Sequence, residues 1–170
     1  VIDIGLAPSA SEFGEVDVMV SAGQFIFDIP TATVRDFLDR DGILLITGSP
    51  LGTSCSRLND QFGTLGLAFE CADQVTGAVS RTETHPLTVG ISGANLAYDI
   101  GASVSASSGD AVLFAYVFDN PPGVEKAVGG VLERGCGRLV LWGADSILDE
   151  SNWALTAPFF TNLLQWARGG

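Results

Sequence analysis

A short unbroken run of apolar residues lies in the first third of the chain. Residues 43–46 (ILLI) do not alternate with polar ones, which indicates a strand buried on both faces, as in a parallel sheet covered by helices. Before it, residues 32–39 have apolar positions at helical spacing, and Gly42 stands where a helix commonly ends in a left-handed turn. After it, residues 48–50 (GSP) predict a tight turn. This turn would lie at the carboxyl end of the strand, which is where open α/β sheets bind their ligands.

The same patterns predict the other elements. We expect strands at 1–6, 16–20, 67–69 and 111–118, helices at 58–65 and 154–168, and a glycine-containing hairpin within 127–142. No internal repeat or linker divides the sequence, so we expect one mixed α/β domain over residues 1–170. Because the chain enters a predicted strand at Val1 without a methionine, we expect it to be part of a longer protein. Whether another strand precedes Val1 stays open.

Charge restricts the classes of partner. The chain of 170 residues has a formal net charge of −12 and a pI near 4.1, and Lys126 is its one lysine. Such a balance repels phosphate backbones and anionic lipid, which argues against nucleic-acid binding. No apolar run approaches the length of a membrane span, so we expect no membrane insertion. The acidic surface itself is interpreted as a solvated one.

The three cysteines leave two interpretations open. Cys55, Cys71 and Cys136 lack metal-ligand spacing, and an odd number excludes a full disulfide framework. One bridge, Cys55 to Cys71, is conceivable if the protein is exported; otherwise all three are ordinary small buried or half-buried residues. Low lysine, high glycine and serine, and this conceivable bridge lean towards an extracytoplasmic location.

Several segments together carry a family resemblance. They are VDVMVSAG (16–23), DGILLITGS (41–49), HPLTVGI (85–91), GCGRLVLWGADS (135–146) and the terminal helix ending TNLLQWA (161–167). In this order they resemble the class I glutamine amidotransferase-like superfamily, and within it the non-catalytic branch that includes the intraflagellar-transport/gliding-motility and trehalose-utilisation-like domains. The resemblance implies a flavodoxin-like, three-layer α/β domain with a central, mostly parallel sheet. The hairpin would then be an antiparallel addition towards the C-terminal half.

The catalytic residues of that superfamily are not matched. Its cysteine occupies the turn after the central strand, where this chain has Gly48, Ser49 and Pro50. Its His-Pro-Glu-like string follows the last strand, where residues 143–146 (GADS) contain no histidine. We therefore expect no glutaminase activity, and more generally a domain that is not an enzyme and holds no cofactor.

A serine nucleophile is the alternative considered at the same turn. Ser49 could be exposed at a strand–turn elbow, but it would need a base, and His85 is the only histidine in the chain. We interpret Ser49 as a turn residue and His85 as a packed or capping residue. A hydrolase using Ser49 remains the second hypothesis.

The predicted turns also supply candidates for binding a ligand or a metal. The ligand-binding candidates are Gly23, Gln24, Gly48, Ser49, Ala144 and Asp145. Tight-turn geometry explains the glycines equally well. The metal candidates are Asp145, Asp149 and Glu150, with Asp28 and Asp119 at the same edge, but their spacing matches no known calcium loop. We therefore interpret these residues as a solvated acidic rim and expect no metal site. A metal-dependent hydrolase is the alternative.

Aromatic residues suggest a third function. Trp142 and Trp166 are expected in the core, whereas Trp153 follows two polar residues and is expected to be exposed. An exposed tryptophan could stack on a sugar, as in a carbohydrate-binding module. The leading hypothesis is a non-catalytic binding or interaction module whose partner is another domain of the parent protein, a second protein or a glycan.

Overall fold

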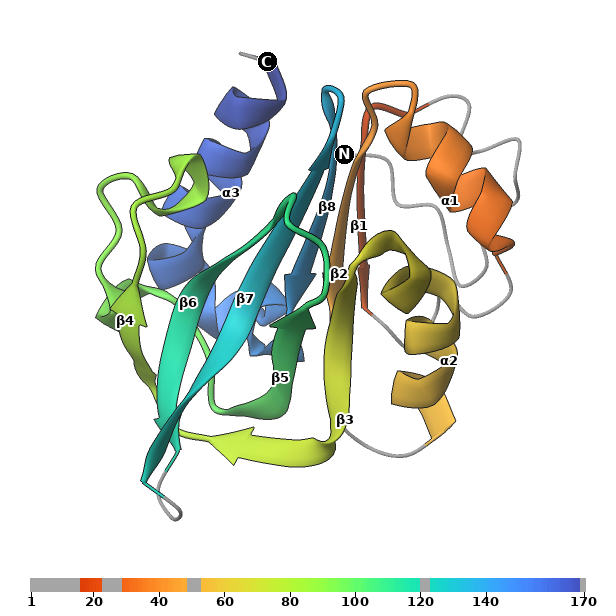
Figure 1. Cartoon of the computed structure of the whole chain (residues 1–170). Coiled ribbons are helices and arrows are strands. Elements are labelled where there is room, and N and C mark those ends of the chain that lie inside the picture. Colours follow the sequence, from red (N-terminus) through yellow and green to blue (C-terminus); the bar gives the residue numbers. More distant parts are fainter. Residues whose placement is uncertain (1–15, 23–28, 49–52, 120–122, 169–170) are drawn as a thin grey trace.

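The computed structural model describes residues 16–22, 29–48, 53–119 and 123–168 (Figure 1). Its main sheet has six strands in the order β1-β2-β8-β7-β6-β4. Their bounds are Val18–Ala22, Ile43–Thr47, Gly137–Trp142, Val124–Arg134, Ala111–Asp119 and Val79–Thr82, respectively. A second, two-stranded sheet pairs β3 (Leu67–Thr76) with β5 (Ile100–Ala106). The helices are α1 (Thr31–Leu38), α2 (Thr53–Phe62) and α3 (Trp153–Arg168).

The buried, parallel strand predicted at residues 43–46 is confirmed, second from the edge of the sheet. Strand β2 lies between β1 and β8 and is parallel to both, and all five of its residues are buried. Its side chains point alternately to the two faces of the sheet, which explains why the run is apolar throughout.

The sheet as a whole is mixed. The expectation of a mostly parallel sheet is met only by β1, β2 and β8, because two neighbouring pairs are parallel and three are antiparallel. The reason lies in the connections: β7 and β8 are joined directly at residues 135–136, and a hairpin can join only antiparallel strands. The predicted hairpin is therefore confirmed, and the mixed α/β class with it.

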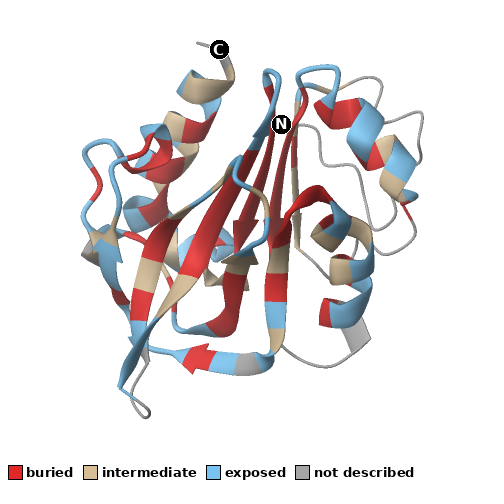
Figure 2. Ribbon diagram, viewed as in Figure 1, coloured by how far each residue is buried: buried red, intermediate tan, exposed pale blue. Residues whose placement is uncertain are grey.

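Two apolar cores cover the two faces of the sheet (Figures 1 and 2). Helices α1 and α2 and the β3–β5 sheet pack on one face, around Phe37, Phe62 and Leu139. Helix α3 packs on the other face, where Phe159 and Leu163 contact the cluster around Trp142. No helix within the described ranges is long and apolar enough to cross a bilayer.

The turn between α1 and β2 differs in detail from the prediction. Asp41 has the left-handed backbone, with φ of 65°, and Gly42 does not. Gly42 is required for a different reason: a Cβ there would lie 2.6 Å from the carbonyl oxygen and ring carbons of Phe37. The absence of a side chain lets the chain turn tightly into the central strand.

Residues Cys55 and Cys71 form a disulfide that ties α2 to β3. Cys136 is a free, exposed thiol in the β7–β8 turn. Of the two interpretations left open by the sequence, the structure contains the single bridge.

Candidate functional site

The arrangement of helices around β2 and β8 identifies the candidate site. Helix α2 follows β2 and lies on one face of the sheet, whereas α3 follows β8 and lies on the other. Two adjacent parallel strands whose following helices diverge in this way form a topological switch point. Ligand sites of open α/β sheets lie just beyond the carboxyl ends of such strands. Here those ends are Thr47 and Trp142, which are partners in the β2–β8 register.

The corner beyond these strands is closed by a side-chain contact. The hydroxyl of Thr47 donates a hydrogen bond to Oδ1 of Asp145, which begins the 3₁₀ helix Asp145–Leu148 after β8. Thr47 is fully buried, and the neighbouring Ala144 is too. Three ligand candidates, Gly48, Ala144 and Asp145, therefore gather at this corner. Thr47 was not predicted as their partner, because its contact with Asp145 spans 98 positions in the sequence.

The glycines at this corner have packing roles. The backbone N–H of Gly48 donates to the carbonyl of Trp142 at 2.7 Å, and a Cβ on Gly48 would lie 2.7 Å from the ring of Phe69. A Cβ on Gly143 would lie 2.0 Å from the carbonyl oxygen of Ala102 in β5. In both places the space that a side chain would need is already occupied by the protein itself.

Further hydrogen bonds hold the segment after β8 in place. Ala97 accepts from Nε1 of Trp142 and from Oγ of Ser146, each at 3.3 Å. The side-chain amide of Asn152 donates to the carbonyl of Ser146 at 2.9 Å. The corner is thus a rigid, internally bonded junction between the sheet and α3. The candidates Gly23, Gln24 and Ser49, and the acidic Asp28, lie outside the described residues.

His85 has a structural role. Its ring Nδ1 accepts a hydrogen bond from the backbone N–H of Leu87 at 3.2 Å, and its backbone N–H donates to Oγ1 of Thr88 at 3.1 Å. These bonds cap the 3₁₀ helix Pro86–Thr88. Burial is the main cause that lowers the pKa of His85 below its ordinary value of 6.5. The predicted capping role is what the structure shows.

His85 is also remote from the corner, because it follows β4, and β6, β7 and β8 lie between β4 and β2 in the sheet. Its ring is 4.9 Å from that of Trp166, which in turn lies 4.3 Å from the guanidinium carbon of Arg138. Arg138 pairs with Ile43 at the amino end of β2, four residues before Thr47. Four strand residues span about 13 Å. His85 is thus out of reach as a base for a group next to Thr47.

The acidic metal candidates form no metal site among the described residues. Oδ1 of Asp149 accepts from the backbone N–H of Ser151 at 2.9 Å, which caps the 3₁₀ helix Glu150–Asn152. That hydrogen bond lowers the pKa of Asp149. Glu150 is exposed. Within the described ranges, no three His, Cys, Asp or Glu side chains lie close enough to hold an ion. The side chain of Asp119 is not described.

Trp142 and Trp153 are placed as predicted, whereas Trp166, expected in the core, lies at its edge. Trp142 is fully buried and Trp166 is half-buried, whereas Trp153 is 55% exposed. The ring of Trp153 stacks on that of Phe160, with centroids 5.5 Å apart and planes at 25°. Trp153 is thus a large, exposed and pre-positioned aromatic surface at the start of α3.

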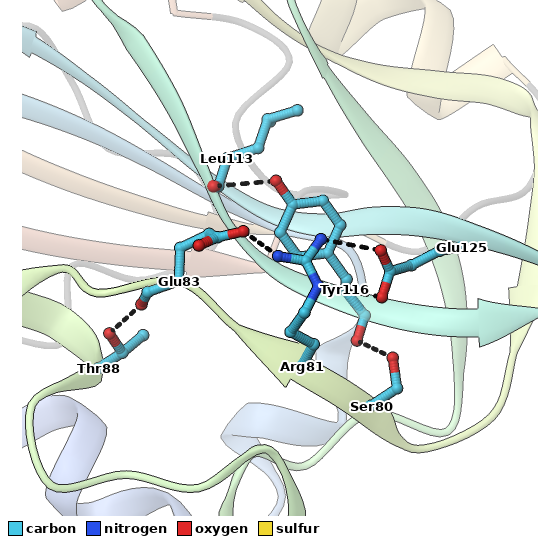
Figure 3. Close-up of polar contacts among 7 residues, drawn as sticks. All are labelled: Ser80, Arg81, Glu83, Thr88, Leu113, Tyr116 and Glu125. Atoms are coloured by element: carbon cyan, nitrogen blue, oxygen red, sulfur yellow. Dashed lines mark hydrogen bonds and ion pairs between the residues drawn. The ribbon is translucent and has the colours of Figure 1, made fainter.

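One polar cluster was not predicted (Figure 3). The guanidinium carbon of Arg81, in β4, lies 3.9 Å from the centre of the Tyr116 ring. The guanidinium also donates hydrogen bonds to the carboxylate of Glu83 and to both carboxylate oxygens of Glu125, the latter two at 3.2 and 2.8 Å. These hydrogen bonds lower the pKa of Glu125. Because β4 is an edge strand, a charged cluster on it discourages pairing with another strand. We assign this cluster a structural role.

Similar folds occur in solved structures. No family model and no curated protein sequence matches this chain. The structure titled mmIFT52 N-terminal domain is similar with a TM-score of 0.74 and 15% identity, over 95% of this chain and 81% of that one. The cytoplasmic protein STM3548 from Salmonella typhimurium has a TM-score of 0.61 and 15% identity, over 93% and 74%.

A third similar structure is an enzyme of which this fold is one part. The β-galactosidase from Rahnella sp. R3 has a TM-score of 0.63 and 15% identity, over 95% of this chain. This chain corresponds to 24% of the β-galactosidase chain. At this level of identity, all three likenesses concern the fold alone.

Proposed function

We propose that this chain is a single, non-catalytic, amidotransferase-like domain that serves as a binding or interaction module in a larger protein. The observation that carries the proposal is the contact between Thr47 and Asp145. It occupies the switch-point corner of β2 and β8, where the related enzymes keep their reactive group. The chain's only histidine follows β4, three strands removed from β2, and caps a 3₁₀ helix.

A flavodoxin-like ancestry is part of the same proposal. It is supported by the parallel strands β1, β2 and β8, which have helices on both faces. The antiparallel strands β7, β6 and β4 extend it on one side. The likeness to the mmIFT52 N-terminal domain agrees with the branch of the superfamily suggested by the sequence.

The compartment is part of the proposal. A disulfide between Cys55 and Cys71 persists in an oxidising environment, which favours an extracytoplasmic protein. The net charge of −12 favours a protein or glycan partner over a nucleic acid.

A turnover screen tests the absence of catalysis. The purified chain is assayed with glutamine, ester and peptide substrates, with and without Mg²⁺ or Ca²⁺, next to Ser49→Ala and Asp145→Asn variants. We expect no turnover above a heat-denatured control in any assay. Turnover that the Ser49→Ala variant abolishes would establish the serine hydrolase instead. Metal-dependent turnover lost in Asp145→Asn would establish an acidic metal site.

A carbohydrate-binding module is the second candidate, and Trp153 favours it. Its exposed ring, held flat by Phe160, has the form of a sugar-stacking platform. To test it, tryptophan fluorescence is measured while a panel of glycans is added. The Trp153→Phe variant is the control, because any change that it still shows comes from the other tryptophans, such as the buried Trp142. Emission unchanged across the panel would exclude this candidate.

A further inference from the structure

Helix α3 has an apolar strip along one flank, which we call the α3 strip. It consists of Trp153, Ala157, Phe160, Leu164 and Ala167. These residues are spaced by four, three, four and three positions, which is the spacing of the seam between two paired helices. Trp153 is 55% and Leu164 39% exposed, and the other three are partly exposed. A seam is therefore present on α3 without a helix packed against it among the described residues.

The α3 strip is distinct from the face of α3 that packs on the sheet. That face is formed by Thr156, Phe159 and Leu163, which are fully or almost fully buried. At 100° per residue, the strip is centred about 90° around the helix from this face. Phe160 and Ala167 pack partly against the core cluster beside this face, whereas Trp153, Ala157 and Leu164 do not belong to it. Packing on the sheet therefore accounts for only part of the strip.

The charge of α3 is equally unusual for a surface helix. From Trp153 to Ala167 the helix has no charged residue, although the chain has 20 acidic residues in 170. A helix on the surface of a monomer normally presents charged side chains to water. An uncharged flank on so acidic a protein is a place where two copies can approach without bringing carboxylates together.

We propose that the α3 strip binds the α3 strip of a second copy of this chain, with the two helices antiparallel. This inference deepens the proposed interaction role, on which it rests, by naming the partner. A two-fold axis at Phe160 places Trp153 opposite Ala167 of the other copy, and Ala157 opposite Leu164. Trp153 and Leu164 then each face an alanine, which suits helix packing, and the two Phe160 rings meet at the axis. The strip is thus complementary to itself.

The charges at the ends of the helix favour the same orientation. Asp149 and Glu150 precede α3, and Arg168 ends it. In an antiparallel pair, the acidic end of one helix lies beside the basic end of the other, and the helix dipoles oppose each other favourably. A parallel pair would bring the acidic ends together.

The contact is small, so the dimer is expected to be weak. A helix of 16 residues is about 24 Å long, and one helix pair buries less than the roughly 1,600 Å² of a standard interface. We expect a dissociation constant of about 10–100 µM.

Sedimentation equilibrium of the whole chain tests the inference over about 5–500 µM. The expected result is a mass that rises with concentration from 17.7 kDa towards twice that value. Leu164→Glu is expected to weaken the dimer by at least about tenfold. Leu155→Glu is the matched control, because Leu155 is a leucine of the same helix, 46% exposed, on the opposite flank. It is expected to change the dissociation constant by less than about threefold.

A charge reversal tests the orientation. Glu150→Arg is expected to weaken the dimer several-fold, and adding Arg168→Glu is expected to restore it. A parallel dimer would instead be strengthened by Glu150→Arg, which would overturn the antiparallel arrangement.

A constant mass of 17.7 kDa over the whole range would overturn the inference, as would an equal effect of Leu155→Glu and Leu164→Glu. A monomer whose Trp153 emission responds to a glycan would show a different occupant of the strip. These outcomes are separate from the turnover screen: a monomer without turnover contradicts only the dimer, and Ser49-dependent turnover contradicts only the non-catalytic role.

Discussion

The guanidinium carbon of Arg138 lies 4.3 Å from the centre of the Trp166 ring, where the last helix meets the amino end of β8. Arg138 is 5% exposed, and its Nη1 donates to the carbonyl of Cys136 at 2.6 Å. A buried guanidinium needs such compensation, because the loss of hydration is costly. The contact between Arg138 of β8 and Trp166 of α3 therefore helps to hold α3 against the sheet.

Removing the ring should expose this dependence. Trp166→Leu is expected to lower the free energy of unfolding by about 2–3 kcal/mol, because Arg138 stays buried without the ring. In a double-mutant cycle with Arg138→Met, measured by urea denaturation, we expect a coupling of about 1–2 kcal/mol. Additive losses would show that the two side chains do not interact.

The buried histidine predicts a dependence on pH. Burial lowers the pKa of His85 in the folded state below 6.5, so the unfolded chain binds the proton more readily. The stability that the neutral ring contributes is fully present above pH 6.5 and is lost as the pH falls through the folded-state pKa. Urea denaturation of the wild type and His85→Asn at several pH values between 5 and 7.5 should show a steeper loss for the wild type. Equal slopes would contradict this prediction.

Two glycines should respond differently to a methyl group. A Cβ on Gly137 would lie 1.8 Å from the carbonyl oxygen of Leu38, so Gly137→Ala is expected to cost more than about 3 kcal/mol. Gly109 has no atom within 4 Å of such a Cβ, and Gly109→Ala should change stability by less than about 1 kcal/mol. Thermal unfolding measures both. Similar melting temperatures would show that β8 and the end of α1 are further apart.

The disulfide predicts the thiol count and a loss on reduction. Without reductant, the denatured chain should react with one equivalent of thiol reagent, at Cys136. Reduction should lower the free energy of unfolding by about 3 kcal/mol, because the bridge closes a loop between positions 16 apart. Three reactive thiols in the untreated chain would exclude the bridge.

Elements defined by local patterns could be predicted from the sequence. The run at 43–46 identified β2, and the glycine-containing segment from 127 to 142 identified the hairpin, because both signals lie within a few residues. Strand β3 was predicted only for residues 67–69 and runs to Thr76. Its second half is mostly polar and is stabilised by pairing with β5, about 30 positions away, which no local pattern reveals.

The candidate site was only partly predictable for the same reason. The sequence placed Gly48, Ala144 and Asp145 in turns at strand ends, and the structure brings them together. That Thr47 bonds Asp145, and that Gly48 accommodates the Phe69 ring, depends on contacts made by the folded chain. Glycine in a turn thus predicted a close approach but not which group would approach.

We expect the corner of β2 and β8 to hold no reactive nucleophile. Intact-mass spectrometry after incubation with a fluorophosphonate, which labels activated serines, and with an electrophilic glutamine analogue, which labels activated thiols, tests it most directly. We predict an unchanged mass with the fluorophosphonate, and with the analogue no label beyond the slow reaction of Cys136 that free thiols show. A stoichiometric adduct on Ser49 that is lost in Ser49→Ala would contradict the account.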